Sequence, residues 1–194
     1  MIGLGDQAAG QGFEPQLPVP ETGVLPLDDP ATGRRDCSRA PARPSDLEPV
    51  DLHESIDETL RLLRRDERCS AAIDIRCDFA PPGPTVRADP NQLRQVFWNV
   101  FLNAVQAMKG AGTLSVATRQ ADGAVQIAVD DTGPGVPRED VVRLFEPFQT
   151  RRPGGIGLGL ATVRRIVEDH GGRVSLSSEP GAGTRVLIAL PHAG

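Results

Sequence analysis

The sequence has few residues of the kinds that form zinc sites, disulfide frameworks and membrane spans. Its 194 residues include only three cysteines and three histidines. The cysteine count is odd, no C-x-x-C spacing occurs and the histidines are scattered, so we expect neither disulfides nor a zinc site. No run approaches the roughly 20 apolar residues that a membrane-spanning helix needs. Residues 1–12 also lack the charged start and apolar stretch of a signal peptide.

The sequence also lacks an excess of basic residues. Its 21 lysines and arginines are outnumbered by 26 aspartates and glutamates, which gives a net charge of -5 and a pI near 5.2. Nucleic acids and anionic membrane surfaces usually bind basic patches, so both are poor candidates for partners. We therefore expect a soluble, cytoplasmic chain. Its length and 39% hydrophobic content suffice for one ordinary core.

The composition changes near residue 46. Residues 1–45 are rich in glycine, proline, alanine and arginine, and they show no sustained helical or alternating apolar period. Such a segment does not bury enough apolar surface to offset the entropy lost on ordering. We therefore predict a disordered or non-native N-terminal segment over residues 1–45 and one folded domain over residues 46–192.

Apolar periodicity predicts a mixture of helices and strands in the second part. The predicted helices are 51–65, 91–108, 139–144 and 160–169, and the predicted strands are 72–79, 113–118, 124–129, 173–177 and 184–190. Asp89-Pro90 is typical of a helix start, Asp122-Gly123 of a hairpin turn, and Gly171-Gly172 of a helix end. The order of elements predicts an α+β fold with helices on one face of a largely antiparallel sheet.

The polar side chains of residues 91–108 fall in one narrow stripe on a helical wheel. The stripe consists of Gln92, Gln95, Asn99, Asn103 and Gln106. Nearly all other residues of this helix are apolar, which predicts burial, with the stripe facing something polar inside the protein. A solvated stripe is the alternative. A carboxamide oxygen is a neutral, hard ligand that suits Mg²⁺.

A second polar feature follows the strand predicted to end at Val129. Asp131 is followed there by Gly133 and Gly135. Turn formation alone explains the glycines about equally well. A carboxylate in this place can also accept a hydrogen bond from the exocyclic amine of adenine, and glycines let the flat ring approach. Asp130 is assigned to the turn or the surface.

The segment Gly155-x-Gly157-x-Gly159 precedes the helix predicted to begin near Leu160. Free backbone N–H groups and the positive end of a helix dipole suit a phosphate group. The sequence lacks G-x-x-x-x-G-K-[ST], a strand directly before these glycines, and the H-R-D and D-F-G motifs of protein kinases. The polar, basic segment 149–154 predicts a lid able to place Arg152 on a phosphate, with plain surface charge as the alternative.

Together with Gly181–Thr184, these motifs resemble the catalytic ATP-binding domain of bacterial sensor histidine kinases, within the GHKL ATPase superfamily. Asn99–Asn103 resembles the N box, Asp131–Gly135 the first glycine box, Leu144–Phe148 the F box, and Gly155–Gly159 and Gly181–Thr184 the later glycine boxes. The resemblance covers residues 47–191, about three quarters of the chain. It implies a two-layer α/β sandwich of the Bergerat type, with a mixed, mostly antiparallel sheet. It also implies ATP and Mg²⁺ as ligands and transfer of the γ-phosphoryl group to a histidine.

The resemblance also implies roles for particular residues. Asn103 is implied as the Mg²⁺ ligand and Asp131 as the adenine ligand, and Asn99 and Arg152 are the expected catalytic residues. The expected nucleotide-binding set is Asn99, Asn103, Gln106, Asp131, Gly133, Gly135, Thr150, Arg152, Gly155, Gly157, Leu158, Gly159, Leu160 and Thr184. Departures from the family pattern occur at Gln106, where many members have lysine, and at Gln149, Arg151 and Ile156 near the lid.

Relatives that hydrolyse ATP have a glutamate where Asn99 stands. Asparagine cannot activate water, which favours transfer to an imidazole over hydrolysis. The sequence lacks the H-E-x-x-x-P context of a phosphoacceptor, because His53-Glu54 is not followed by the proline. His170 is expected to close its helix, and His192 lies in the tail.

We therefore expect the phosphoacceptor histidine on a dimerisation domain that is separate or missing, followed by a response regulator. Residues 1–36 are hypothesised to be a misread or frame-shifted start of a longer sensor kinase. Two alternatives stay open: a serine kinase that binds a sigma factor, and a non-enzymatic nucleotide-sensing module.

Overall fold

A five-stranded sheet in the order β2-β4-β5-β7-β6 forms the frame of the computed structural model, which describes residues 47–79, 83–121, 123–146 and 157–193. Its strands are β2 (Ile73–Phe79), β4 (Gly112–Ala121), β5 (Ala124–Asp131), β6 (Arg173–Glu179) and β7 (Gly183–Pro191). β2 and β4 pair in parallel, and the other neighbours pair antiparallel. The predicted mixed, mostly antiparallel sheet is therefore confirmed.

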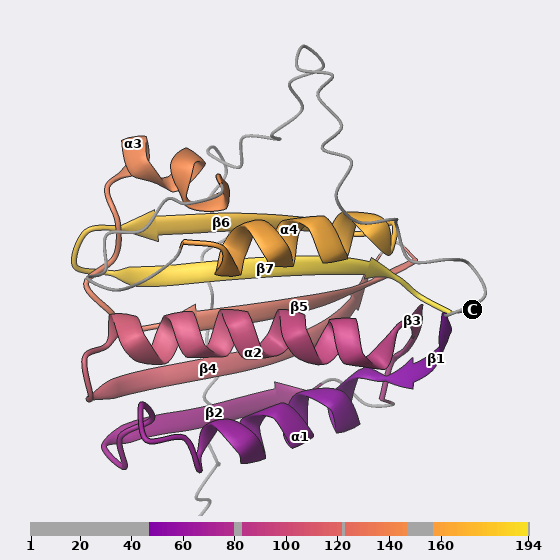
Figure 1. The fold of residues 1–194 in the computed structure, drawn as a ribbon, viewed down its shortest axis with the longest axis horizontal. Helices are drawn as coiled ribbons and strands as arrows, with labels where there is room; N and C mark the ends of the chain where they lie inside the picture. The colour runs from indigo at the N-terminus through magenta and orange to yellow at the C-terminus, as the bar shows by residue number, and fades with distance from the viewer. Residues whose placement is uncertain (1–46, 80–82, 122, 147–156, 194) are drawn as a thin grey trace, which may run out of the picture.

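Three helices cover one face of this sheet (Figure 1). They are α1 (Leu52–Leu63), α2 (Pro90–Ala107) and α4 (Gly159–Asp169), with α2 between the other two. This arrangement confirms the predicted two-layer α/β sandwich. The short helix α3 (Arg138–Val141) and the 3-10 helix η2 (Val142–Phe145) occupy the region predicted as one short helix. No helix of the described ranges has the length and apolar character required to cross a membrane.

Two strands were not predicted from the sequence. β1 (Glu48–Asp51) and β3 (Thr85–Ala88) pair antiparallel as a separate two-stranded sheet next to the start of α1. Each has only four residues, which is too short for an alternating pattern to stand out. The predicted N-terminal segment 1–45 lies outside the described residues.

Acidic caps fix the starts of the first two helices. The Asp51 carboxylate accepts hydrogen bonds from the backbone N–H groups of His53 (2.8 Å) and Glu54 (3.1 Å). Asp89 caps α2 in the same way, and Pro90 occupies the first turn, where its missing N–H costs nothing. The predicted helix start at Asp89-Pro90 is confirmed.

The core lies between α2 and the sheet. The apolar face of α2 is almost fully buried, with Phe97 and Phe101 at 0% exposure, and it packs in one cluster with the inward side chains of β5. Those side chains alternate along the strand as Val125, Ile127 and Val129. Burying each such side chain contributes about 1.5–3 kcal/mol, so the central helix is held firmly against the sheet. Trp98 and Leu102 are half-buried at the margin of this cluster.

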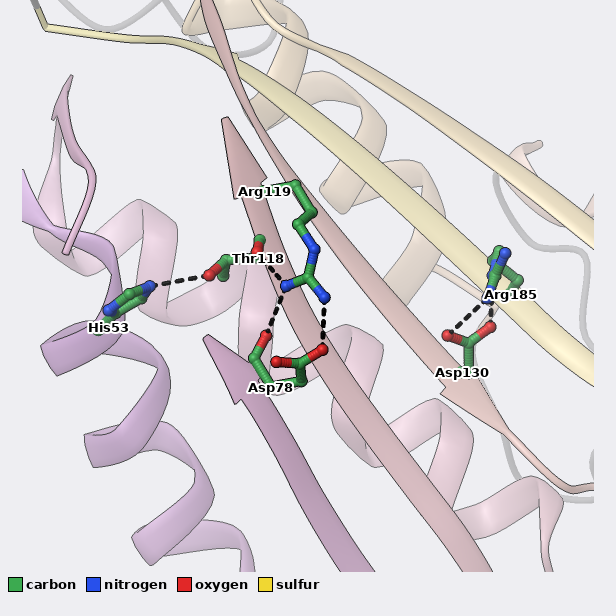
Figure 2. Close-up of polar contacts among 6 residues, drawn as sticks. All are labelled: His53, Asp78, Thr118, Arg119, Asp130 and Arg185. Carbon is green, nitrogen blue, oxygen red and sulfur yellow. Dashed lines mark hydrogen bonds and ion pairs between the residues drawn. The ribbon is translucent and has the colours of Figure 1, made fainter. Parts of the chain in front are cut away.

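The face of the sheet away from the helices carries ion pairs (Figure 2). Arg119 on β4 pairs with the carboxylate of Asp78 on β2, and it also donates hydrogen bonds to the carbonyls of Asp78 and Thr118. Asp130 on β5 pairs with Arg185 on β7 at 2.5 Å. Asp130 therefore lies within a strand, on the outer face, and not in a turn.

Two histidines join separate elements. Nε2 of His53, at the start of α1, lies 2.8 Å from Oγ1 of the buried Thr118 (Figure 2). The ring of His53 also stacks on the ring of Phe79. His170 follows α4, as predicted, and it is buried. Its Nε2 accepts a hydrogen bond from the backbone N–H of Asp89 (3.1 Å), so its Nδ1 carries the proton and donates to the carbonyl of Ile166 (2.7 Å).

Candidate functional site

The predicted polar stripe of α2 lies next to the beginning of α4. A Cβ atom built on Gly159, the first residue of α4, would lie 3.5 Å from Nδ2 of Asn103 and 3.9 Å from Oδ1 of Asn99. Both asparagines are half-buried. A side chain at position 159 would therefore stand against the two carboxamides, and glycine leaves that space open.

The start of α4 has the properties of an anion-binding helix terminus. Its N-cap residue is Leu158, whose side chain cannot cap it, and its first turn contains no acidic residue. Gly157 precedes it with φ +71°, a left-handed conformation that glycine adopts without strain. Backbone N–H groups and the positive dipole end therefore face the region beside Asn99 and Asn103, which favours a bound anion such as phosphate.

The carboxylate of Asp131 lies at the end of β5 on the helix-facing side of the sheet. It is 9% exposed, and its Oδ1 accepts a hydrogen bond from the backbone N–H of Gly133 at 2.8 Å. A Cβ atom on Gly133 would lie 2.7 Å from that oxygen and 3.2 Å from Cβ of Ala107, the last residue of α2. Gly133 is thus required for the close approach of this loop to the helix.

α2 connects the two parts of the site. Asn103 and Ala107 are one helical turn apart, about 6 Å along the axis. Asn103 faces the start of α4, and Ala107 contacts the loop that follows Asp131. The structure therefore places the anion-favouring terminus and the buried carboxylate along one side of one helix.

The turn between β6 and β7 closes the carboxylate end of the site. Thr184 pairs with Asp131 across β5 and β7, so both side chains lie on the same face of the sheet. Gly183 has φ +92°, and a Cβ atom there would lie 1.9 Å from the Asp131 carbonyl oxygen. Gly135 has φ +67°, and its Cβ atom would lie 1.9 Å from the Glu179 carbonyl oxygen. Only glycine fits either position.

The remaining predicted site residues divide into two groups. Gln106 and Leu160 are half-buried in α2 and α4, and Leu158 is 40% exposed. Thr150, Arg152 and Gly155 lie outside the described residues, as do Pro147 and Phe148 of the expected F box. Within the described ranges, Leu144 and the buried Phe145 of that box lie in or at the end of the 3-10 helix η2.

Ser178 and Thr132 were not predicted as site residues from the sequence. The Ser178 hydroxyl contacts the loop after β5 and the turn between β6 and β7, and Thr132 Oγ1 accepts a hydrogen bond from the Thr113 N–H at 2.9 Å. One signal for Ser178 was available, because it continues the alternation Val174, Leu176 on the helix-facing side of β6. A hydroxyl at the end of such a series indicates a polar contact inside the protein.

The donor chemistry of the site fits Mg²⁺ better than a transition metal. No group of three or more histidine, cysteine, aspartate or glutamate side chains in the described part of the chain could hold a metal on its own. Mg²⁺ does not need one, because it takes few protein ligands and completes its shell with water and substrate phosphates. A carboxamide beside an anion-binding helix terminus is compatible with that mode.

This fold, with a helix terminus that favours anions and a strand-end carboxylate along one side of α2, is that of a nucleotide-binding domain. Residues 88–194 match the family described as histidine kinase-, DNA gyrase B-, and HSP90-like ATPase, and the chain belongs to this family. Membership implies ATP binding. The family predicted from the five motifs is confirmed.

Individual relatives agree with this assignment. The chain is 38% identical over 145 residues to the sensor histidine kinase ZraS of Escherichia coli O157:H7, covering 75% of this chain and 31% of that protein. It is 36% identical over 170 residues to the sensory histidine kinase/phosphatase NtrB of Rhodobacter capsulatus, covering 78% and 45%. The chain thus spans less than half of the length of these two relatives.

Solved structures give the same result. A mycobacterial sensor histidine kinase, MprB, superposes with a TM-score of 0.68 at 33% identity, covering 75% of this chain and 97% of that one. Full-length ShkA in complex with AMPPNP superposes with a TM-score of 0.67 at 35% identity. The superposition covers 76% of this chain and 31% of the ShkA chain.

Proposed function

We propose that this chain is the ATP- and Mg²⁺-binding catalytic domain of a sensor histidine kinase of a two-component system. Its reaction is transfer of the γ-phosphoryl group of ATP to a histidine on a dimerisation domain, and a response regulator receives the group next. The main support for this proposal is that Asn99 and Asn103 of α2 lie beside the start of α4. The names of the relatives, and the nucleotide analogue in the ShkA structure, support the same reading.

The adenine end of the proposed site is at Asp131. An ionised carboxylate at 9% exposure accepts strong hydrogen bonds, and the exocyclic amine of adenine donates them. Gly133 and Gly135 let the loop after Asp131 pack closely against α2 and the end of β6, and Thr184 lies across the strand pair from Asp131. A hydrogen bond to a buried charged group is worth about 1.5–3 kcal/mol, so removal of the charge weakens ATP binding about ten- to a hundredfold.

The phosphate end of the proposed site is at the start of α4. Backbone N–H groups after Gly157 and Gly159 bind phosphate oxygens, and Asn103 offers its carboxamide oxygen to Mg²⁺. The cation, when bound, neutralises charge on the phosphates. Gln106, Leu158 and Leu160 line the site beside these groups. Thr150 and Arg152 are assigned to the lid from the sequence motifs, with Arg152 acting on the transferred phosphate. Gly155 is assigned to the glycine motif that binds phosphate.

Asn99 favours transfer over hydrolysis. Its carboxamide does not accept a proton, so it cannot act as a general base toward water. A histidine acceptor needs no such base, because a neutral imidazole is already a nucleophile. Two of the three described histidines have side-chain contacts elsewhere, with His53 against Thr118 and His170 between α4 and α2. His192 is expected to lie in the tail, and none of the three has the sequence context of a phosphoacceptor. The acceptor is therefore proposed to lie on the dimerisation domain, in the cytoplasm.

Binding of Mg²⁺-ATP tests the adenine end of the site. Titration calorimetry on the wild type, Asp131→Asn and Asp130→Asn uses two adjacent carboxylates on opposite faces of the sheet. We expect Asp131→Asn to weaken binding about ten- to a hundredfold, and Asp130→Asn to bind like the wild type. Equal affinities for all three proteins would contradict the assignment of Asp131.

Phosphoryl transfer tests the reaction itself. The chain is incubated with ATP labelled in the γ position and the histidine-bearing dimerisation domain of a relative such as NtrB. We expect label that is stable in base and lost in acid, as for phosphohistidine. Acid-stable label on a serine of a partner would favour the serine-kinase alternative, and ATP binding without transfer would favour the nucleotide-sensing module.

A further inference from the structure

One hydroxyl group connects three segments at the adenine end of the proposed site. Ser178 Oγ, near the end of β6, lies 2.8 Å from the backbone nitrogen of Val136, 2.8 Å from the carbonyl oxygen of Gly183 and 3.0 Å from Oγ1 of Thr184. Val136 lies in the loop 132–137, which follows Asp131 at the end of β5, and Gly183 and Thr184 begin β7. The serine therefore holds this loop against the β6–β7 turn.

These three contacts use the full capacity of the Ser178 hydroxyl. A hydroxyl has one proton to donate and two lone pairs to accept with. Ser178 donates to the Gly183 carbonyl and accepts from the Val136 N–H, so its second lone pair accepts the proton of Thr184. Thr184 is thereby oriented with its own lone pairs available as acceptors, on the side of the sheet that also carries Asp131.

The loop and the turn are in direct backbone contact on both sides of Ser178. The Gly181 N–H donates to the Pro134 carbonyl at 2.8 Å, and Gly135 and Gly183 have no room for a Cβ atom. The position of the loop 132–137 is therefore set by the turn that it contacts. Of the bonds described between them, the one from the Val136 N–H to Ser178 Oγ is the one that a side-chain substitution can remove.

We infer that Ser178 is a positioning residue for base recognition, an inference that rests on the proposed function. It holds the loop that contains Gly133, whose N–H binds the Asp131 carboxylate, and it orients Thr184 as a second acceptor beside Asp131. Two acceptors side by side suit the 6-amino group of adenine, and they repel the carbonyl oxygen that guanine and hypoxanthine carry there. Ser178 therefore contributes to selection of ATP by acting through two other residues.

Paired titrations with two nucleotides test this role. Mg²⁺-ATP and Mg²⁺-purine riboside triphosphate, which lacks the 6-amino group, are titrated into the wild type, Ser178→Ala, Ser178→Thr and Ser177→Ala. Ser177 is the matched control, since it is exposed and lies on the opposite face of β6. We expect Ser178→Ala to weaken ATP binding about 5- to 30-fold and the purine analogue less than about twofold. We expect the ratio of the affinities for the two nucleotides to return to the wild-type value in Ser178→Thr and to stay at that value in Ser177→Ala.

A general loss of structure would weaken the binding of both nucleotides. If Ser178→Ala weakens both nucleotides equally, or neither, Ser178 has no role in reading the base and the inference is overturned. Thr184→Val provides a second measurement should Ser178→Ala not fold, because it keeps the side-chain shape and removes the oriented acceptor. If the ratio of the two affinities in Thr184→Val equals that of the wild type, the inference is overturned as well. A wild type that binds neither nucleotide contradicts the proposed function instead.

Discussion

Asp130 and Asp131 are neighbours on β5, yet their carboxylates lie on opposite faces of the sheet. Asp131 faces the helices, is 9% exposed and accepts the Gly133 N–H. Asp130 faces outward and pairs with Arg185 at 2.5 Å, and that hydrogen bond raises the pKa of the guanidinium. Strand alternation alone therefore separates a candidate ligand-binding carboxylate from a surface ion pair.

The Asp130–Arg185 pair is expected to contribute little to stability. Its side chains are 33% and 41% exposed, and such pairs are worth about 0.2–1 kcal/mol because water screens them. Arg185→Gln should lower the free energy of unfolding by no more than about 1 kcal/mol, with a smaller loss in 1 M salt. Urea denaturation at low and high salt measures this. A loss above about 2 kcal/mol that salt does not reduce would show that the pair is effectively buried.

Gly183 and Gly181 have similar backbone angles but different surroundings. Both have positive φ, +92° and +81°, so alanine costs about 1–2 kcal/mol at either position. A Cβ atom at Gly183 would also meet the Asp131 carbonyl at 1.9 Å, whereas at Gly181 no atom lies within 4 Å. Gly181→Ala should therefore fold with a modest loss in thermal stability. Gly183→Ala should lose several times more, or fail to accumulate as folded protein, and similar melting temperatures would contradict the close approach described here.

His170 should be important for stability although it lies outside the candidate site. Its imidazole bridges α4 and the start of α2, and its replacement by alanine leaves the partly buried Asp89 N–H without this partner. We expect a cost of about 1–3 kcal/mol in the free energy of unfolding. His192→Ala serves as the control, because the bonds described for His192 involve its backbone. Nitrogen NMR should also show the His170 proton on Nδ1 and not on Nε2.

Local signals in the sequence predicted most of the fold. The starts of α1 and α2 depend on Asp51, Asp89 and Pro90, whose effects extend only over the following turn. The central strands show strict alternation, because one side of each is buried. The strands β1 and β3 gave no such signal, since each is only four residues long. Their pairing joins positions that are far apart in the sequence, Asp51 with Thr85 and Glu48 with Ala88.

The candidate site was predictable where a polar residue interrupts an apolar pattern. Asn99, Asn103 and Asp131 stand out for that reason, and the structure places them along α2 and at the end of β5. Ser178 was missed because the partner that gives it a role, Val136, is 42 residues away in the sequence. The parallel pairing of β2 with β4 was not specified either, since periodicity reports which face is buried and not the direction of the neighbouring strand.

The carboxyl group of Asp66, in the turn after α1, should titrate at an unusually low pH. Asp66 accepts hydrogen bonds from Nε and Nη2 of Arg68 at 2.7 Å each and from its backbone N–H at 2.9 Å. These hydrogen bonds lower the pKa of Asp66 from 3.8 to about 2. The bonds from the Arg68 side chain have the largest effect, and the bond from the Arg68 backbone has the next largest. Because the folded-state pKa is depressed, the stabilising contribution is present above about pH 4 and is lost as the pH falls toward 2.

Replacement of Arg68 should remove this shift. A carbon NMR titration of the wild type is expected to show Asp66 titrating near pH 2, and Arg68→Gln should return it toward 3.8, because the charged donor is gone. Arg76→Gln is the matched control, since that arginine pairs with Asp74 on β2 and has no contact described with this turn. Arg68 also lies 5.9 Å from the ring of Trp98, the only tryptophan, so its fluorescence should change in Arg68→Gln but not in the control. A wild-type Asp66 that titrates near 3.8 would mean that the turn does not hold this geometry in solution.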